Sequence, residues 1–265
     1  MSEQAPREAP RTRLRKIFRL VHRVWITLGS AAFVVFVTWA LIAYRANGEA
    51  RRAMVSDPRV TVLEAESYWS FVPSGDAKGA ALVFFPGALV DPIAYAPLLR
   101  RVAEHGHPVI LVRVPRRGAF GGADGPEAID RARAGMRTVP APCWVVAGHS
   151  RGAEITSRAL LRDAAAFRGA LLIGSSHPRD VSLAHLRMPM TRVYGTRDTV
   201  ADVEKLEATR HNLPAHTRWV PIDGGNHSQF GYYGFQPGDW PATISREAQQ
   251  AITLSELLAA LSAAR

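Results

Sequence analysis

The segment Gly148-His149-Ser150-Arg151-Gly152 constrains the fold of this chain more than any other part of its sequence. It has the pattern G-x-S-x-G, in which a serine lies on a sharp turn between a β-strand and an α-helix. The glycines flank the serine because a tight, strained turn leaves no room for Cβ atoms. Five letters alone are weak evidence, so the flanking sequence decides the interpretation.

The residues around this segment have the order strand, turn, helix that the pattern requires. Residues 142–147 form a short apolar run rich in β-formers, which indicates a buried strand. Residues 151–162 have apolar side chains at helical spacing, with polar side chains between them. The alternative, a surface serine in a glycine-rich turn, does not account for this agreement on both sides.

Strand and helix patterns alternate from residue 59 to the carboxyl terminus. Two short strands are expected to open this region as an antiparallel pair, at 59–64 and 68–72. Continuous apolar strands at 80–85, 109–114, 142–147, 169–173, 190–194 and 217–222 then alternate with helices at 93–104, 126–136, 151–162, 200–210 and 244–263. This alternation predicts an α/β fold with a mostly parallel central sheet of about seven or eight strands and helices on both faces.

The amino-terminal part of the chain has a basic tail followed by an uncharged apolar segment. Residues 1–23 hold seven Lys and Arg against two Glu, which is half of the net charge of +10. Residues 24–44 have no charged side chain, and a helix of this length crosses a hydrocarbon core of about 30 Å. We interpret 1–23 as a basic tail, 24–44 as a transmembrane helix, 45–58 as a polar linker and 59–265 as one α/β domain.

A cleaved signal peptide and a buried core helix are the alternatives to a membrane anchor. A signal peptide normally has a shorter apolar region and a small-x-small cleavage site, which residues 43–46 match poorly. More Lys and Arg precede the segment than follow it, so we expect a single-pass protein whose domain lies outside the cytoplasm. The lipid bilayer is then the partner of residues 24–44. No nucleic-acid motif is present, so no nucleic-acid partner is expected.

Four segments, in this order along the chain, resemble the α/β-hydrolase superfamily, and look closest to its small lidless members related to dienelactone hydrolase. They are residues 85–91 after the first predicted parallel strand, the Ser150 segment, residues 194–198 after a late strand and residues 224–231 after the last strand. The order Ser, Asp, His is the one that this fold uses.

The resemblance implies a serine hydrolase with Ser150 as nucleophile, His227 as general base and Asp198 as the acid that orients the histidine. It places the oxyanion hole at the backbone N–H groups of Ala88 and Arg151. It implies a small acyl substrate, no metal and no organic cofactor. Esterase, thioesterase, amidase, lactonase and acyltransferase chemistry all use such a triad. A non-catalytic binding scaffold is the alternative outside enzymes.

Several residues compete for these roles. Asp202 is the alternative acid, and Asp198 is alternatively a helix cap. The alternatives to His227 are His149, His177, His211 and His216.

Substrate contacts are the least specific part of the prediction. We expect Leu89, Phe230 and Tyr232 to line a substrate pocket, while packing of the following loop is the alternative for the two aromatic side chains. The Arg151 side chain faces an anionic substrate group or pairs with an acidic neighbour, either Glu154 or Asp91.

Overall fold

The computed structural model describes residues 10–264 except 76 and 78, and the chain divides into two compact units, Met1–Ile42 and Ala43–Arg265. The first nine residues of the predicted basic tail lie outside the described residues. Each unit is described by itself below.

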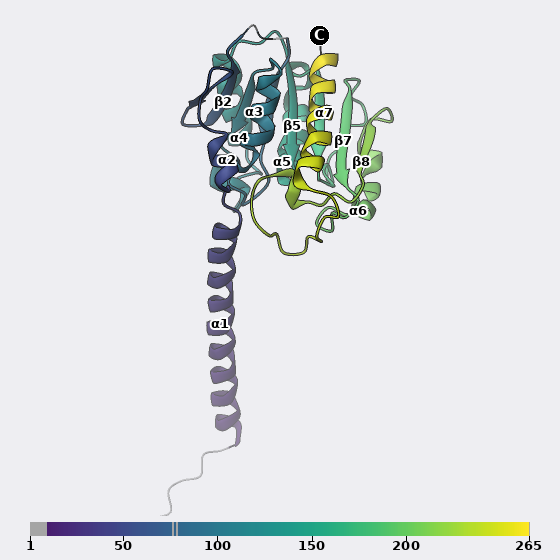
Figure 1. Cartoon of the computed structure of the whole chain (residues 1–265). Helices are drawn as coiled ribbons and strands as arrows, with labels where there is room; N and C mark the ends of the chain where they lie inside the picture. The colour runs from purple at the N-terminus through teal and green to yellow at the C-terminus, as the bar shows by residue number, and fades with distance from the viewer. Residues whose placement is uncertain (1–9, 76, 78, 265) are drawn as a thin grey trace, which may run out of the picture. The chain divides into compact units, whose positions relative to one another are not determined.

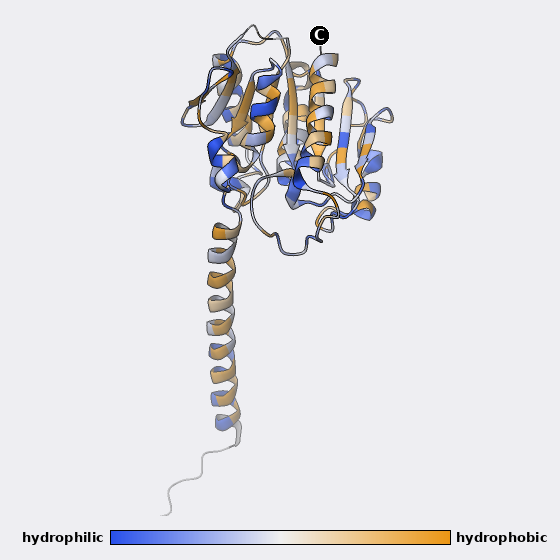
Figure 2. Cartoon of the chain, in the orientation of Figure 1, coloured by the Kyte–Doolittle hydropathy of each residue, from blue (hydrophilic) through white to orange (hydrophobic). Residues whose placement is uncertain are grey.

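Helix α1 (Pro10–Ala43) begins inside the predicted basic tail and ends one residue before the end of the predicted membrane segment, residue 44. Arg and Lys are good helix formers, so the basic residues after Pro10 extend the helix upstream. Residues Arg13–Trp39 are long and apolar enough to cross a membrane. Figure 2 shows apolar residues along most of α1 and hydrophilic ones at its amino-terminal end.

The segment predicted as a linker, 45–58, is part of the second compact unit rather than a free connection. It contains the short helix α2 (Gly48–Arg52), in which Ala50 is fully buried. Arg100, from the body of the unit, forms an ion pair with Asp57 at 2.7 Å. The polar composition concealed this packing because the buried side chains of the segment are the small Ala46 and Ala50, and further contacts join it to residues distant in the sequence.

The second unit is built on one eight-stranded sheet with the order β1-β2-β4-β3-β5-β6-β7-β8 (Figure 1). The β1–β2 and β2–β4 pairs are antiparallel and the other pairs are parallel, which confirms the predicted α/β fold. The strands are β1 (Val60–Glu64), β2 (Tyr68–Pro73), β3 (Ala81–Phe85), β4 (Val109–Val112), β5 (Trp144–His149), β6 (Gly169–Ile173), β7 (Met190–Gly195) and β8 (Arg218–Ile222).

Helices cover both faces of this sheet, which explains why β3, β4, β5 and β6 are buried at every position. Helix α3 (Ala96–Glu104) packs against α7 (Arg246–Ala263) on one face, and α4 (Glu127–Thr138) packs against α5 (Arg151–Asp163) on the other (Figure 1). The short helix α6 (Val203–Ala208) joins β7 to β8. A 3₁₀ turn at Pro92–Tyr95 replaces the first turn of the helix predicted at 93–104.

The turn between β5 and α5 requires glycine on both sides of Ser150. A Cβ on Gly148 would lie 2.2 Å from the carbonyl oxygen of Gly152, and a Cβ on Gly152 would lie 2.0 Å from the carbonyl oxygen of Phe85. Ser150 itself has φ 53° and ψ −120°, a conformation that costs energy in any residue with a side chain. The Ser150 N–H donates to the carbonyl oxygen of Ile173 at 2.9 Å, which helps to hold the turn.

The Gly152→Ala substitution is expected to lower the free energy of unfolding by about 3 kcal/mol, because its Cβ meets backbone atoms that cannot move aside. Urea denaturation of the full chain in detergent measures the change. The matched control is Gly75→Ala, whose Cβ meets nothing within 4 Å. This control should stay within about 0.5 kcal/mol of the parent. Equal stability of the two variants would show that the turn relaxes without cost.

Candidate active site

The predicted site residues follow the carboxyl ends of parallel strands, which meet at one edge of the sheet, here called the site edge. Ala88 follows β3, Ser150 follows β5, Asp198 follows β7 and His227 follows β8. Open α/β sheets bind ligands at this edge. The topology therefore gathers residues that are far apart in the sequence.

Asp198 and His227 form a buried pair at the site edge. His227 Nδ1 lies 2.7 Å from Asp198 Oδ2, and both side chains are shielded from solvent. The other carboxylate oxygen of Asp198 accepts the backbone N–H groups of Val200 and Ala201, at 2.9 and 2.7 Å. Asp198 therefore caps the following turn with one carboxylate oxygen and contacts His227 with the other, so the two predicted roles do not exclude each other.

The alternative acid and two of the alternative histidines, His211 and His216, lie elsewhere. Asp202 caps α6 through a hydrogen bond from the backbone N–H of Lys205 at 2.9 Å. His211 is exposed, and His216 is exposed and bonds the carbonyl oxygen of Met188 at 3.0 Å. The structure thus brings together the Asp and His that the sequence favoured.

Asp239 is a positioning residue that the sequence did not reveal. One of its carboxylate oxygens accepts the backbone N–H of His227 at 3.1 Å, and the other accepts that of Ser228 at 2.8 Å. Asp239 is buried although it belongs to the long loop after β8. The turn sequence around it looks like that of any surface loop, so only the folded structure identifies it.

Tyr95 and His149 connect the loop after β3 to the Ser150 turn. The Tyr95 hydroxyl accepts the Gly87 N–H at 3.0 Å and lies 2.7 Å from His149 Nδ1. Burial raises the pKa of Tyr95, whereas burial and the neighbouring His227 hold the pKa of His149 well below its usual range. Both groups are therefore neutral, and one hydrogen bond joins them. The His149 ring also packs against the His227 ring at an interplanar angle of 47°, with centroids 4.5 Å apart.

The two predicted oxyanion donors have no competing acceptor. Among the described residues, no backbone hydrogen bond uses the N–H of Ala88 or of Arg151. Gly87, which precedes Ala88, is held by Tyr95, and a Cβ there would lie 2.9 Å from the Tyr95 hydroxyl oxygen. Neither N–H group has a hydrogen-bond partner among the described residues, and the residue before Ala88 approaches Ser150, since a Cβ on Gly87 would lie 3.5 Å from the Ser150 Cβ.

The Arg151 side chain forms ion pairs with acidic neighbours. Its Nε lies 2.9 Å from Glu154 Oε2, and its Nη2 contacts the Asp124 carboxylate. Asp91, the other predicted partner, instead accepts the backbone N–H of Ile93 at 3.2 Å. The pairing with Glu154 is one of the arrangements expected from the sequence, and Asp124 is an added partner.

Two of the three predicted substrate contacts are packed rather than open. Phe230 is 1% exposed, and its ring centroid lies 5.3 Å from that of His149. Tyr232 is buried, and its backbone N–H donates to the carbonyl oxygen of Ala94 at 2.7 Å. Leu89 is half-buried and has φ 64°. Only Leu89 presents surface beside the Ser150 turn, so packing, the alternative for the two aromatic side chains, describes them.

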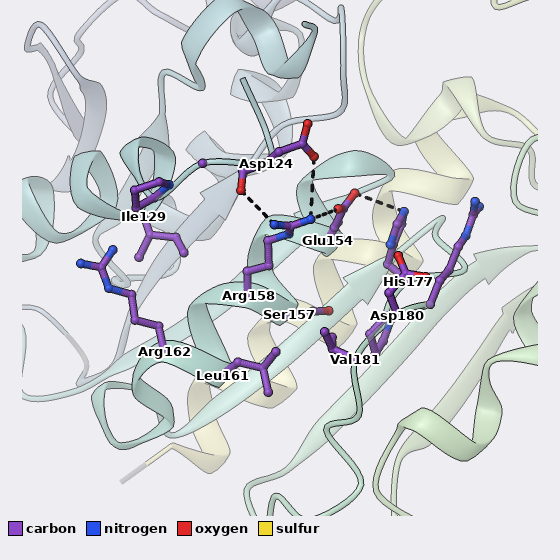
Figure 3. Close-up of a pocket in the computed structure, with 14 residues that line it drawn as sticks. Asp124, Ile129, Glu154, Ser157, Arg158, Leu161, Arg162, His177, Asp180 and Val181 are labelled. Atoms are coloured by element: carbon purple, nitrogen blue, oxygen red, sulfur yellow. Dashed lines mark hydrogen bonds and ion pairs between the residues drawn. The ribbon is translucent and has the colours of Figure 1, made fainter. Parts of the chain in front are cut away.

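A separate cavity of about 480 Å³ follows one face of α5, beginning one helical turn beyond Ser150. Figure 3 shows Asp124, Glu154, Arg158 and His177 converging at one end of it. Burial lowers the pKa of His177 to about 4 although Glu154 opposes this shift, so the ring is neutral at pH 7. Ser150, Asp198 and His227 are not among the lining residues, so this cavity is distinct from the cluster at the site edge.

Lowering the pH from 6.5 towards 4 is expected to reduce the free energy of unfolding. In this pH range His177 binds a proton in the unfolded chain but not in the folded protein, where burial lowers its pKa to about 4. The free energy of unfolding is therefore largest above pH 6.5 and decreases as the pH falls towards 4. Chemical denaturation at a series of pH values should show a shallower decline for His177→Gln than for the parent. The exposed His211→Gln variant is the control and should keep the parent slope; parallel curves for all three proteins would contradict the assignment.

Comparison with known proteins adds evidence on family and fold. A model of the alpha/beta hydrolase family matches residues 81–251, while no curated protein matches the sequence. Among solved structures, TT1662 from Thermus thermophilus is 18% identical with a TM-score of 0.55, covering 77% of this chain and 98% of that chain.

Two further similar solved structures are those of hydrolases. A dienelactone hydrolase-like promiscuous phosphotriesterase, P91, from metagenomic libraries is 15% identical with a TM-score of 0.58, covering 77% of this chain and 99% of that chain. A ferulic acid esterase from Streptomyces cinnamoneus is 20% identical with a TM-score of 0.55, covering 72% of this chain and 68% of that chain. These likenesses show the fold. The match of the family model over residues 81–251 establishes that the chain belongs to the alpha/beta hydrolase family.

Proposed function

We propose that this protein is a membrane-anchored serine hydrolase that cleaves a carboxylic ester or a related acyl bond. The observation that carries the proposal is the buried His227–Asp198 pair, with 2.7 Å between Nδ1 and Oδ2, at the same sheet edge as the strained Ser150. Strained backbone of this kind persists only where the surrounding structure holds it in place, and it is enriched at functional sites.

The chemistry follows from the donor and acceptor inventory of the pair. An ionised carboxylate only accepts, so the proton of neutral His227 lies on Nδ1 and the lone pair lies on Nε2. Nε2 takes the proton of the Ser150 hydroxyl as its Oγ attacks the substrate carbonyl carbon. The C–O bond to the leaving group then breaks, and the departing oxygen receives that proton from His227. Water repeats the sequence on the acyl-enzyme and releases the acid.

The backbone N–H groups of Ala88 and Arg151 supply the oxyanion hole in this proposal. Charge develops on the carbonyl oxygen during attack, and fixed donors in place before the reaction stabilise it without reorganisation. The Gly87–Tyr95–His149 connection supports this role because it fixes the loop carrying Ala88 relative to the Ser150 turn.

The geometry does not distinguish between the acyl bonds that the protein could cleave. Similarity to a ferulic acid esterase favours an ester, while thioesters, amides, lactones and acyl transfer need the same groups. A binding scaffold without activity is the alternative and predicts no turnover. We further propose that α1 anchors the chain in a bilayer and that the excess of Lys and Arg before the apolar segment places the second unit outside the cytoplasm.

Replacing Ser150 by alanine is expected to lower turnover of p-nitrophenyl acetate by at least about a thousandfold, because the acyl-enzyme is no longer formed. A spectrophotometric assay of the full chain in detergent measures the loss. Ser182→Ala, at an exposed serine, is the control and should match the parent. Turnover by Ser150→Ala equal to that of the parent would refute the serine mechanism.

Asp198→Asn and Asp202→Asn separate the two candidate acids. The asparagine at 198 keeps an acceptor for Val200 and Ala201 but loses the charge that stabilises the imidazolium, so kcat should fall by about 10² to 10⁴. Asp202→Asn should stay within about twofold of the parent, because this residue caps α6. The reverse order of effects would reassign the acid.

A further inference from the structure

The chain enters the second unit at the site edge. The carbonyl oxygen of Ala43 accepts the Gly234 N–H at 2.8 Å, and that of Tyr44 accepts the Asp91 N–H at 2.9 Å. Asp91 ends the loop that carries Ala88, and Gly234 lies in the loop that follows His227. The first two residues of the second unit are therefore bonded to the loops after β3 and β8, which carry Ala88 and His227.

No charged segment separates the apolar span from this entry point. The uncharged apolar residues run from 24 to 44, and the second unit begins at Ala43. The headgroup layer on each side of a bilayer is of the order of 5–8 Å thick. A membrane-inserted span therefore holds the entry point close to the bilayer surface.

The exposed aromatic side chains of the second unit belong to the same edge. Among its described residues, the exposed Phe, Trp and Tyr side chains are Phe120, Phe235 and Trp240, at 78%, 66% and 59% of full exposure. Phe120 lies in the loop after β4, and the other two lie in the loop after β8. Aromatic side chains are enriched where protein meets the membrane interface, because an apolar ring can enter the acyl boundary.

Both of these loops contact residues next to the candidate site. A Cβ on Gly118, two residues before Phe120, would lie 3.5 Å from the Ala88 Cα. The carbonyl oxygen of Trp240 accepts the side-chain amide of Asn226 at 2.8 Å, next to His227. The aromatic side chains are therefore attached to the walls of the candidate site.

Exposed basic side chains accompany the aromatic ones. Arg45, Arg51 and Arg52 are exposed in the entry segment, against Glu49, and Arg116 is exposed in the Phe120 loop. Basic residues next to a membrane span attract anionic headgroups. Charge and aromatic exposure thus favour the same occupant of this surface, a lipid bilayer.

We propose that the site edge rests on the bilayer surface through Phe120, Phe235 and Trp240, and that the acyl substrate is a membrane-resident amphiphile. This inference rests on the proposed roles of α1 as an anchor and Ser150 as the nucleophile. A lipid-like acyl bond at the boundary between headgroups and chains reaches Ser150 without leaving the membrane. The substrate class follows from where the site is held.

Fluorescence quenching tests the docking independently of catalysis. In a Cys143→Ser background, single cysteines at Phe120, Phe235 and Leu161 are labelled with a fluorophore, and the full chain is reconstituted into phosphatidylcholine–phosphatidylglycerol vesicles with brominated acyl chains. Leu161 is the control, since it is 45% exposed near the end of α5 that is remote from the Ser150 turn. Labels at 120 and 235 should be quenched at least about threefold more strongly than the label at 161. Equal quenching at the three positions, or none, overturns the docking.

A paired assay tests the substrate class. The double variant Phe120→Ser/Phe235→Ser should lose about tenfold of the parent's turnover of p-nitrophenyl palmitate held in vesicles, yet stay within about twofold on soluble p-nitrophenyl acetate. Leu161→Ser should match the parent on both esters. An equal effect of the double variant on the two esters, or no effect, overturns the proposal.

The two experiments separate failure of this inference from failure of the proposed function. A parent protein that hydrolyses neither ester contradicts the hydrolase proposal and its substrate class, and quenching then decides whether the edge docks. Release of the full chain from vesicles by alkaline carbonate contradicts the anchor and with it the docking.

Discussion

The close approach of α5 to the end of β3 is the contact on which the arrangement at the site edge depends. Gly152 lies so near Phe85 that a Cβ would fall 2.0 Å from its carbonyl oxygen. This contact places the end of β3 beside the first turn of α5, which follows directly on the strained Ser150.

Buried polar contacts then fix the groups around that turn. Asp198 holds the His227 ring, Asp239 holds its backbone, and Tyr95 links the loop after β3 to His149. A buried polar group is costly unless it is paired, so these residues have few alternative arrangements. The groups of the proposed active site are thus held in place before any substrate binds, which is the condition for electrostatic stabilisation of a transition state.

Local sequence patterns predicted the architecture. Continuous apolar strands indicate a sheet covered on both faces, and the glycines around Ser150 indicate a close approach of backbone. The Asp198–His227 pair was predicted from the resemblance of the ordered motifs to the α/β-hydrolase superfamily. Tyr95 and Asp239 did not follow, because their roles depend on contacts between distant segments that no spacing encodes. The packing of Phe230, Tyr232 and the segment 45–58 was likewise hidden, since composition describes polarity and not the neighbours that cover a side chain.

The central proposal is that His227 activates the Ser150 hydroxyl. Mapping of a covalent adduct on Ser150 tests this activation most directly. The folded full chain is treated with a fluorophosphonate, which reacts with an activated serine hydroxyl, and the adduct is located by peptide mass spectrometry. We expect about one adduct per chain, on the peptide that contains Ser150, and its loss in a His227→Gln variant. The absence of an adduct in folded protein, or an adduct on another serine that survives this substitution, would contradict the account.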